Sequence, residues 1–209
     1  MKTTTIQLYD FNELSEKSKQ NAISEFLNKG YNDGEYNYQE AHESVKKFND
    51  IFSVRNSNNS WLDFSYLNLD NDILELSGIR LYKYIINNFY SDLFKPAYVK
   101  SYEKHFNHKR AKNKTYKNGI IASFFYSNLN VTNSCVLTGV CWDDDLLQPI
   151  YEFLKKPCKY TNLNDLIKEC FESLRISLEK SDEYYTSDEF ISETLQINNY
   201  QFTKDGSIY

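Results

Sequence analysis

Apolar residues that recur at helical spacing are the feature that most limits what this chain can fold into. Ala41, Val45, Phe48 and Phe52 lie on one face of a helix, so residues 37–52 are predicted to form an amphipathic helix. The same reasoning predicts helices over residues 15–29, 146–156, 161–180 and 186–197, and favours one over 79–94. The inward-facing residues expected in two of them are Ile23, Phe26 and Leu27, and Leu163, Leu166, Ile167, Cys170, Phe171 and Leu174.

Strands are predicted between these helices. Residues 3–9 are rich in β-branched side chains and place Ile6 and Leu8 on one face, which predicts an opening strand. Residues 61–77 indicate a hairpin that closes at Asp70–Asp72. Residues 119–127 and 134–142 indicate a further pair of strands. Only six glycines and three prolines occur in 209 residues, which favours long regular elements over a loop-rich scaffold. The sequence shows no internal repeat and no linker, so it predicts one α+β domain over residues 1–209, with antiparallel strands packed against about five helices.

The C-terminal stretch carries several ordering signals. Thr186 and Glu189 match a T-x-x-E capping box, and Tyr185 and Phe190 stand where a hydrophobic staple would place them. Asn198 and Asn199 can end the helix in a left-handed conformation. Tyr200 and Phe202 then alternate as in a strand before the Asp205-Gly206 turn signal. These signals predict that the tail folds as part of the core.

Several classes of protein are disfavoured by the sequence. No stretch approaches the roughly 18 apolar residues that cross a membrane, and residues 1–19 lack the apolar segment of a signal peptide. The cysteines, Cys135, Cys141, Cys158 and Cys170, are therefore expected to be reduced thiols in a cytoplasm, with Cys135 and Cys141 in the core. Their spacing matches no zinc pattern.

No catalytic constellation emerges. His42 has no nucleophile near it in sequence, and His105 and His108 lack a third ligand, so a solvated basic segment is preferred to a metal site. The acidic run Asp143–Asp145 suits Mg²⁺, but its position before an apolar helix favours acids that complement a helix dipole. We therefore expect no enzyme activity, no metal and no cofactor.

Positive charge is concentrated in one place. Between Lys95 and Lys117 there are eight lysines and arginines against one acid, whereas residues 1–50 hold nine acids against six bases and residues 143–209 hold fourteen against seven. Basic residues interleaved with aromatic rings are what a phosphate backbone and unstacked bases would contact, although charge runs are usually solvated. The predicted binding residues are Lys100, Tyr102, Lys104, Lys109, Arg110, Lys112, Lys114, Tyr116 and Lys117. An acidic face could instead occupy the nucleic-acid channel of another protein.

Three segments resemble a family of small proteins carried by phages, prophages and plasmids. LYDFNELSEKSKQNAISEF is similar to the family's opening strand and its F-x-E-L-S-x-x-A-K helix, with Ser18 in place of the usual alanine. SCVLTGVCWDDDLLQPIYEFLKKP and YYTSDEFISETLQINNYQFTKDG resemble a second and a closing block. Genes of this kind lie where inhibitors of host defence accumulate, anti-CRISPR proteins among them, so the resemblance implies an anti-defence role by association.

Three functions follow as hypotheses. The first is a non-enzymatic inhibitor that binds a host defence protein, with a Cas effector nuclease or its ribonucleoprotein as the favoured partner, and nucleic acid as a further partner through the basic window. The second is an antitoxin or accessory regulator of a plasmid or prophage. The third is an unrecognised nucleic-acid-processing enzyme. No membrane partner is expected.

Overall fold

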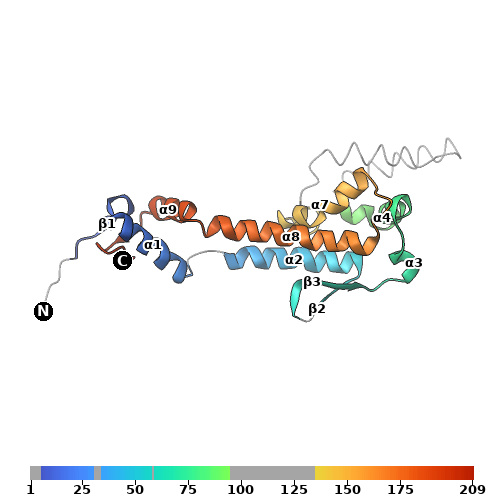
Figure 1. The fold of residues 1–209 in the computed structure, drawn as a ribbon, viewed down its shortest axis with the longest axis horizontal. Coiled ribbons are helices and arrows are strands. Elements are labelled where there is room, and N and C mark those ends of the chain that lie inside the picture. The colour runs from blue at the N-terminus through green and yellow to red at the C-terminus, as the bar shows by residue number, and fades with distance from the viewer. Residues whose placement is uncertain (1–5, 31–33, 58, 95–134) are drawn as a thin grey trace. The chain divides into compact units, whose positions relative to one another are not determined.

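The computed structural model describes residues 6–30, 34–57, 59–94 and 135–209 (Figure 1). In these ranges the fold is mixed α+β and mostly helical, which confirms the predicted fold class. The helices are η1 (Phe11–Glu13, a 3-10 turn), α1 (Glu16–Asn28), α2 (Gly34–Phe52), α3 (Asn71–Leu74), α4 (Gly78–Leu93), α7 (Trp142–Lys155), α8 (Leu163–Tyr185) and α9 (Asp188–Ile197). Two antiparallel pairs of strands complete it, β1 (Tyr9–Asp10) with β4 (Gln201–Phe202) and β2 (Val54–Ser57) with β3 (Ser60–Leu67).

The chain divides into two compact units. Unit 1 combines Met1–Tyr38 with Leu178–Tyr209, and unit 2 is Gln39–Ser177. The two boundaries fall inside α2 and α8. That residues 1–209 form a single domain stays a prediction.

Unit 1 has a core that draws on both ends of the chain. Eight buried residues form it: Phe11, Leu14, Ala22, Ile23 and Phe26 from the N-terminal side, and Ile191, Leu195 and Phe202 from the C-terminal side. Phe202, fully buried on β4, meets the ring of Phe11 edge to face at 5.9 Å between centroids. The tail is therefore part of a core, as its ordering signals predict. The two end segments that carry the family resemblance are the ones that build this unit.

Polar groups on one face of α1 hold the turn that follows β4. Ser18 Oγ donates to the carbonyl of Lys204 at 2.9 Å, Asn21 Nδ2 donates to the carbonyl of Asp205 at 3.0 Å, and Glu25 Oε2 accepts from the N–H of Ile208 at 2.9 Å. The turn itself needs Gly206, whose φ is +94° and whose missing Cβ would lie 2.0 Å from the carbonyl oxygen of Ser18. The Asp-Gly signal thus marks a turn that docks on a helix.

Unit 2 is organised around α2 and α8, whose ribbons lie side by side there (Figure 1). The four apolar residues predicted to line α2 are at most 1% exposed, and the six predicted for α8 are at most 4% exposed. Phe48 of α2 meets Phe171 of α8 edge to face at 5.8 Å. The buried residues of α4 and α7 complete this core, and Tyr151 of α7 donates its hydroxyl to the carbonyl of Leu93 at 2.7 Å. Burial raises the pKa of Tyr151 well above its ordinary value.

The predicted hairpin over residues 61–77 is wrong. Its first strand forms as β3, but β3 pairs with the preceding strand β2, and the chain reverses between Ser57 and Ser60. Ser53, in the left-handed region at φ 55°, turns the chain out of α2 directly into β2, and this supplies β3 with a partner upstream. Asp70, an extended residue of a type that favours helix starts, precedes the short helix α3, where a second strand was expected.

The predicted strand over residues 134–142 is also wrong where the structure describes it. Residues 135–141 form a loop in which the N–H groups of Leu137, Thr138 and Gly139 all donate to Asp143 Oδ2, at 2.8–3.1 Å. Successive N–H groups of a strand point to opposite sides, so they could not converge on one carboxylate. Its predicted partner, residues 119–127, lies outside the described residues.

Smaller errors concern single residues. Leu27 is 36% exposed and Ala22 takes its place in the core, while Cys141 is exposed and Cys135 only half-buried. Residues 6–8 of the predicted opening strand are not extended into a sheet, because pairing with β4 begins at Tyr9. In α9 the capping side chain belongs to Ser187, which accepts from the N–H of Phe190 at 3.2 Å, one residue later than predicted.

Candidate functional site

The predicted basic window lies outside the described residues. This applies to all nine predicted binding residues: Lys100, Tyr102, Lys104, Lys109, Arg110, Lys112, Lys114, Tyr116 and Lys117. It applies equally to His105 and His108. The role given to this segment stays a prediction.

The acids Asp143–Asp145 are engaged with protein groups. Asp143 is fully buried, and besides its three backbone donors it accepts from Thr138 Oγ1 at 2.9 Å and from Ser44 Oγ of α2 at 2.7 Å. Asp144 Oδ1 accepts from the N–H of Cys135, and Asp145 Oδ1 accepts from Ser177 Oγ. These carboxylates therefore tie a loop, α2 and α8 to the first turn of α7. Among the described residues, no three His, Cys, Asp or Glu side chains gather as metal ligands.

Negative charge is concentrated in unit 1. Its sequence holds thirteen acids against six bases, a net charge of −7, whereas unit 2 holds sixteen acids against eighteen bases, a net charge of +2. The densest part is residues 182–193, with five acids and no base. We call this stretch, which covers the end of α8 and most of α9, the acidic segment. These acids are counted above only within the total for residues 143–209. The absence of any lysine or arginine from residues 182–193 is the sequence signal that distinguishes the segment.

Carboxylates of the acidic segment face solvent. Glu183, Asp188, Glu189 and Glu193 are exposed, and within the described part of the chain none of them has a lysine or arginine at ion-pair distance. This contrasts with α1, where Glu16 pairs with Lys19 at 2.9 Å and Glu25 pairs with Lys29 at 2.5 Å. A partner with basic side chains could thus reach these four carboxylates without displacing an ion pair.

An exposed aromatic cluster accompanies these carboxylates. Tyr184 is 59% exposed and contacts the rings of Tyr185 at 5.3 Å and Phe190 at 5.1 Å, while Tyr185 meets Phe190 edge to face at 4.9 Å. The contact expected of the staple pair therefore forms, although the cap residue is Ser187. Tyrosine is enriched in protein interfaces because one ring offers both apolar area and a hydroxyl. Ring packing holds this one at the junction of two helices.

Asp182 is held by a tyrosine. The Tyr38 hydroxyl of α2 donates to Asp182 Oδ2, and this hydrogen bond, with burial and the negative charge of Asp182, raises the pKa of Tyr38 to about 12. The contact lies within unit 1. Asp182, the first acid of the acidic segment, is therefore engaged by Tyr38, unlike the four carboxylates above.

Comparisons with known proteins give no match: no protein-family model, curated protein or solved structure is similar to this chain. The resemblance to mobile-element proteins accordingly stays a prediction. In the ranges that the structure describes, no helix combines the length and apolar character needed to span a bilayer.

Proposed function

We propose that this protein is a non-enzymatic inhibitor, encoded by a phage, prophage or plasmid, that binds a CRISPR-Cas effector in the bacterial cytoplasm and blocks its binding or cleavage of nucleic acid. The observation that carries the proposal is the division of charge, which gives the 70 residues of unit 1 a net charge of −7. Enzymes that handle nucleic acid line their channels with lysine and arginine, which neutralise phosphates. A compact acidic unit competes for such a channel.

The acidic segment suits this role because its charges are held on helices. Ile191 and Leu195 anchor α9 because they are fully buried in the core of unit 1, so the backbone that carries the α9 carboxylates is held in place. A preorganised surface loses less conformational entropy on binding than a flexible acidic tail would. Tyr184 adds apolar contact area beside the charges. The mobile-element resemblance of the two segments that build unit 1 supports the defence-related target.

The first experiment identifies the partner and the stoichiometry. The tagged full-length protein is captured from a host lysate that contains CRISPR-Cas effectors, the bound proteins are identified by mass spectrometry, and inhibition of cleavage by the purified effector is then titrated. We expect inhibition to be complete at about one inhibitor per effector and unchanged when the inhibitor is pretreated with EDTA. Recovery of a small toxin, or inactivation by far fewer copies than the target, would contradict the proposal.

The second experiment locates the contact. Neutralising Glu183, Glu189 and Glu193 to glutamine should weaken effector binding at least about tenfold, which is roughly 1.4 kcal/mol. The matched control, Asp72→Asn with Glu75→Gln and Asp92→Asn, makes the same charge change on exposed residues of unit 2 and should leave the affinity unchanged. Replacement of Lys109, Arg110, Lys112 and Lys114 by glutamate tests the basic window in the same assay. If that variant alone loses affinity, at least about tenfold with a smaller salt dependence, unit 1 is not the contact.

A further inference from the structure

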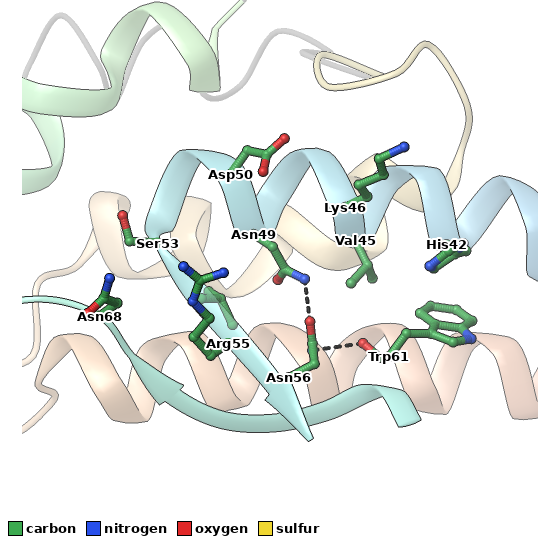
Figure 2. A pocket seen from close by; sticks show the side chains of 11 residues that line it. His42, Val45, Lys46, Asn49, Asp50, Ser53, Arg55, Asn56, Trp61 and Asn68 are labelled. Carbon is green, nitrogen blue, oxygen red and sulfur yellow. Dashed lines mark hydrogen bonds between the residues drawn. The ribbon is translucent and has the colours of Figure 1, made fainter. Parts of the chain in front are cut away.

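Unit 2 contains a hollow of about 510 Å³ between α2 and the β2–β3 pair (Figure 2). Small-ligand pockets in proteins commonly have volumes of about 300–1,000 Å³, and this one is within that range. Its lining is unusual in being mainly polar, with three asparagines, Asn49, Asn56 and Asn68, among the side chains.

The centre of the hollow contains a buried acceptor with no hydrogen-bond partner. Asn56 Nδ2 donates to the carbonyl of Trp61 at 2.8 Å, which fixes the Asn56 amide with its oxygen toward Asn49. Asn49 must then present its amide nitrogen to that oxygen, as Figure 2 shows. Asn49 Oδ1 is left buried and unsatisfied, and turning the amide over would only bring two oxygens together. An unsatisfied buried polar atom costs about 1–3 kcal/mol. Asn49 Oδ1 has almost no accessible surface, so a donor in the hollow reaches it only after a small shift of the Asn49 side chain, and the hydrogen bond then relieves that cost.

The two ends of the hollow differ in chemistry. At one end the rings of His42 and Trp61 are in contact at 5.2 Å between centroids, beside the buried side chain of Val45. At the other end lies Arg55, an exposed residue with no carboxylate at ion-pair distance within the described residues (Figure 2). Lys46 and Asp50, on successive turns of α2, also line the hollow, and Lys46 lies nearer His42 than Arg55. An aromatic end, a central acceptor and a guanidinium therefore follow one another along the hollow.

We propose that this hollow binds a nucleotide. The base lies against Trp61 and His42, one of its N–H groups donates to Asn49 Oδ1 once that side chain has shifted, and the phosphate is bound by Arg55. Each of the four bases has an N–H donor on its pairing edge, and aromatic rings stack on any of them, so little base preference is expected. Guanidinium binds phosphate with two parallel hydrogen bonds. A simple carboxylate would satisfy Arg55 but leave the aromatic end and Asn49 unused. This site lies in unit 2 and does not depend on the proposed function.

Fluorescence of Trp61 provides the test. The chain has two tryptophans, so Trp142→Phe leaves Trp61 as the reporter. AMP, adenosine, inorganic phosphate and a ten-residue oligoadenylate are each titrated into this protein. We expect AMP to quench Trp61 with a Kd below about 1 mM, and adenosine and phosphate each to bind more weakly. A tighter oligoadenylate identifies single-stranded nucleic acid as the source of the nucleotide, whereas tighter AMP identifies the free nucleotide. No quenching by either, or phosphate that binds as well as AMP, would overturn the proposal.

Two variants separate the contacts. Arg55→Gln should weaken AMP binding at least about tenfold and leave adenosine unchanged, while Arg80→Gln on the exposed face of α4, with the same charge change, should affect neither. Asn49→Ala should weaken AMP and adenosine alike. Equal effects of Arg55→Gln and Arg80→Gln would show that only overall charge matters and would refute the site. Because Arg55 and Arg80 are both exposed, their variants are expected to fold, so this comparison holds even if Asn49→Ala disturbs the packing of α2 on the β2–β3 pair.

Discussion

Unit 1 and unit 2 make a buried core in different ways. Unit 1 brings together residues from opposite ends of the chain into a core of eight residues, and its sequence has seven more acids than bases. Unit 2 uses one continuous stretch, has a larger apolar core on four helices, and surrounds its buried carboxylate, Asp143, with hydrogen-bond donors. Unit 2 therefore supplies most of the buried apolar core. In unit 1, repulsion among the excess carboxylates opposes folding, and the same carboxylates form its acidic face.

Deleting residues 186–209 should have the largest effect. The deletion removes three of the eight core residues of unit 1, so hydrogen exchange should show that α1 loses protection while α2, α7 and α8 up to Ser177 keep theirs. The point variant Phe202→Ala should cost about 3–5 kcal/mol, measured by denaturant unfolding. Loss of protection throughout unit 2 as well would break the comparison and show that residues 1–209 unfold as one domain.

Asp143→Ala probes unit 2 in the corresponding way. The change removes the acceptor that three backbone N–H groups share. Because Thr138 and Gly139 are exposed and water can reach their N–H groups, we expect a loss of about 1–3 kcal/mol in urea unfolding. Asp143→Asn should cost less, because an amide oxygen can still accept those three bonds. If the alanine variant is as stable as the parent, the buried carboxylate is not what organises the loop before α7.

The helix predictions succeeded where one physical pattern decides the outcome. Ala41, Val45, Phe48 and Phe52 are buried as predicted, because a stripe at helical spacing has one way to bury itself. The errors arise where a distant group competes with local pattern. Residues 135–141 alternate like a strand, but three of their N–H groups donate to Asp143 instead of to a neighbouring strand. β3 pairs with β2 because the left-handed conformation of Ser53 turns the chain from α2 directly into β2.

The candidate site was less accessible from sequence than the fold. The excess of acids at both ends was visible, but that those ends join in one unit follows from contacts such as that between Phe11 and Phe202, 191 positions apart. Similarly, nothing in the sequence indicates that His42 and Trp61 are in contact, because the contact depends on how α2 packs against β3. The predicted basic window lies outside the described residues, so its role rests on the binding experiments above.

The start of α9 offers a smaller effect. Ser187→Ala should cost about 0.5–2 kcal/mol, because Ser187 Oγ caps the N–H of Phe190. Thr186→Ala should cost less, since Thr186 Oγ1 donates to the carbonyl of Asp182 in α8 and caps no α9 donor. Thermal unfolding of the two variants ranks them, and a greater loss for Thr186→Ala would restore the capping box expected from the sequence.

The smallest expected effect concerns pH and unit 1. The hydrogen bond from Lys29 and the N–H of Ile208 lower the pKa of Glu25 below its ordinary 4.5, against a partial opposing effect of burial. The lowered pKa stabilises the fold above pH 4.5, and the gain is lost as the pH falls through the folded-state value. Glu25→Gln should therefore lose no more than about 1 kcal/mol at pH 7, and the difference should shrink below pH 4.5. Glu193→Gln is the control, with the same charge change on an exposed carboxylate in the middle of α9, and it should change the stability little at either pH.

The joining of both chain ends in unit 1 has a consequence for synthesis. A ribosome makes about 5–20 residues per second, so roughly 10–40 s separate α1 from α9. During that interval Ile23 and Phe26 lack the C-terminal part of their core, because Ile191, Leu195 and Phe202 do not yet exist. The nascent chain must carry this apolar helix face until residues 188–208 emerge, and any product that stops short displays it to chaperones and proteases. The acidic face is therefore completed only after the residues of α9 and β4 have been made.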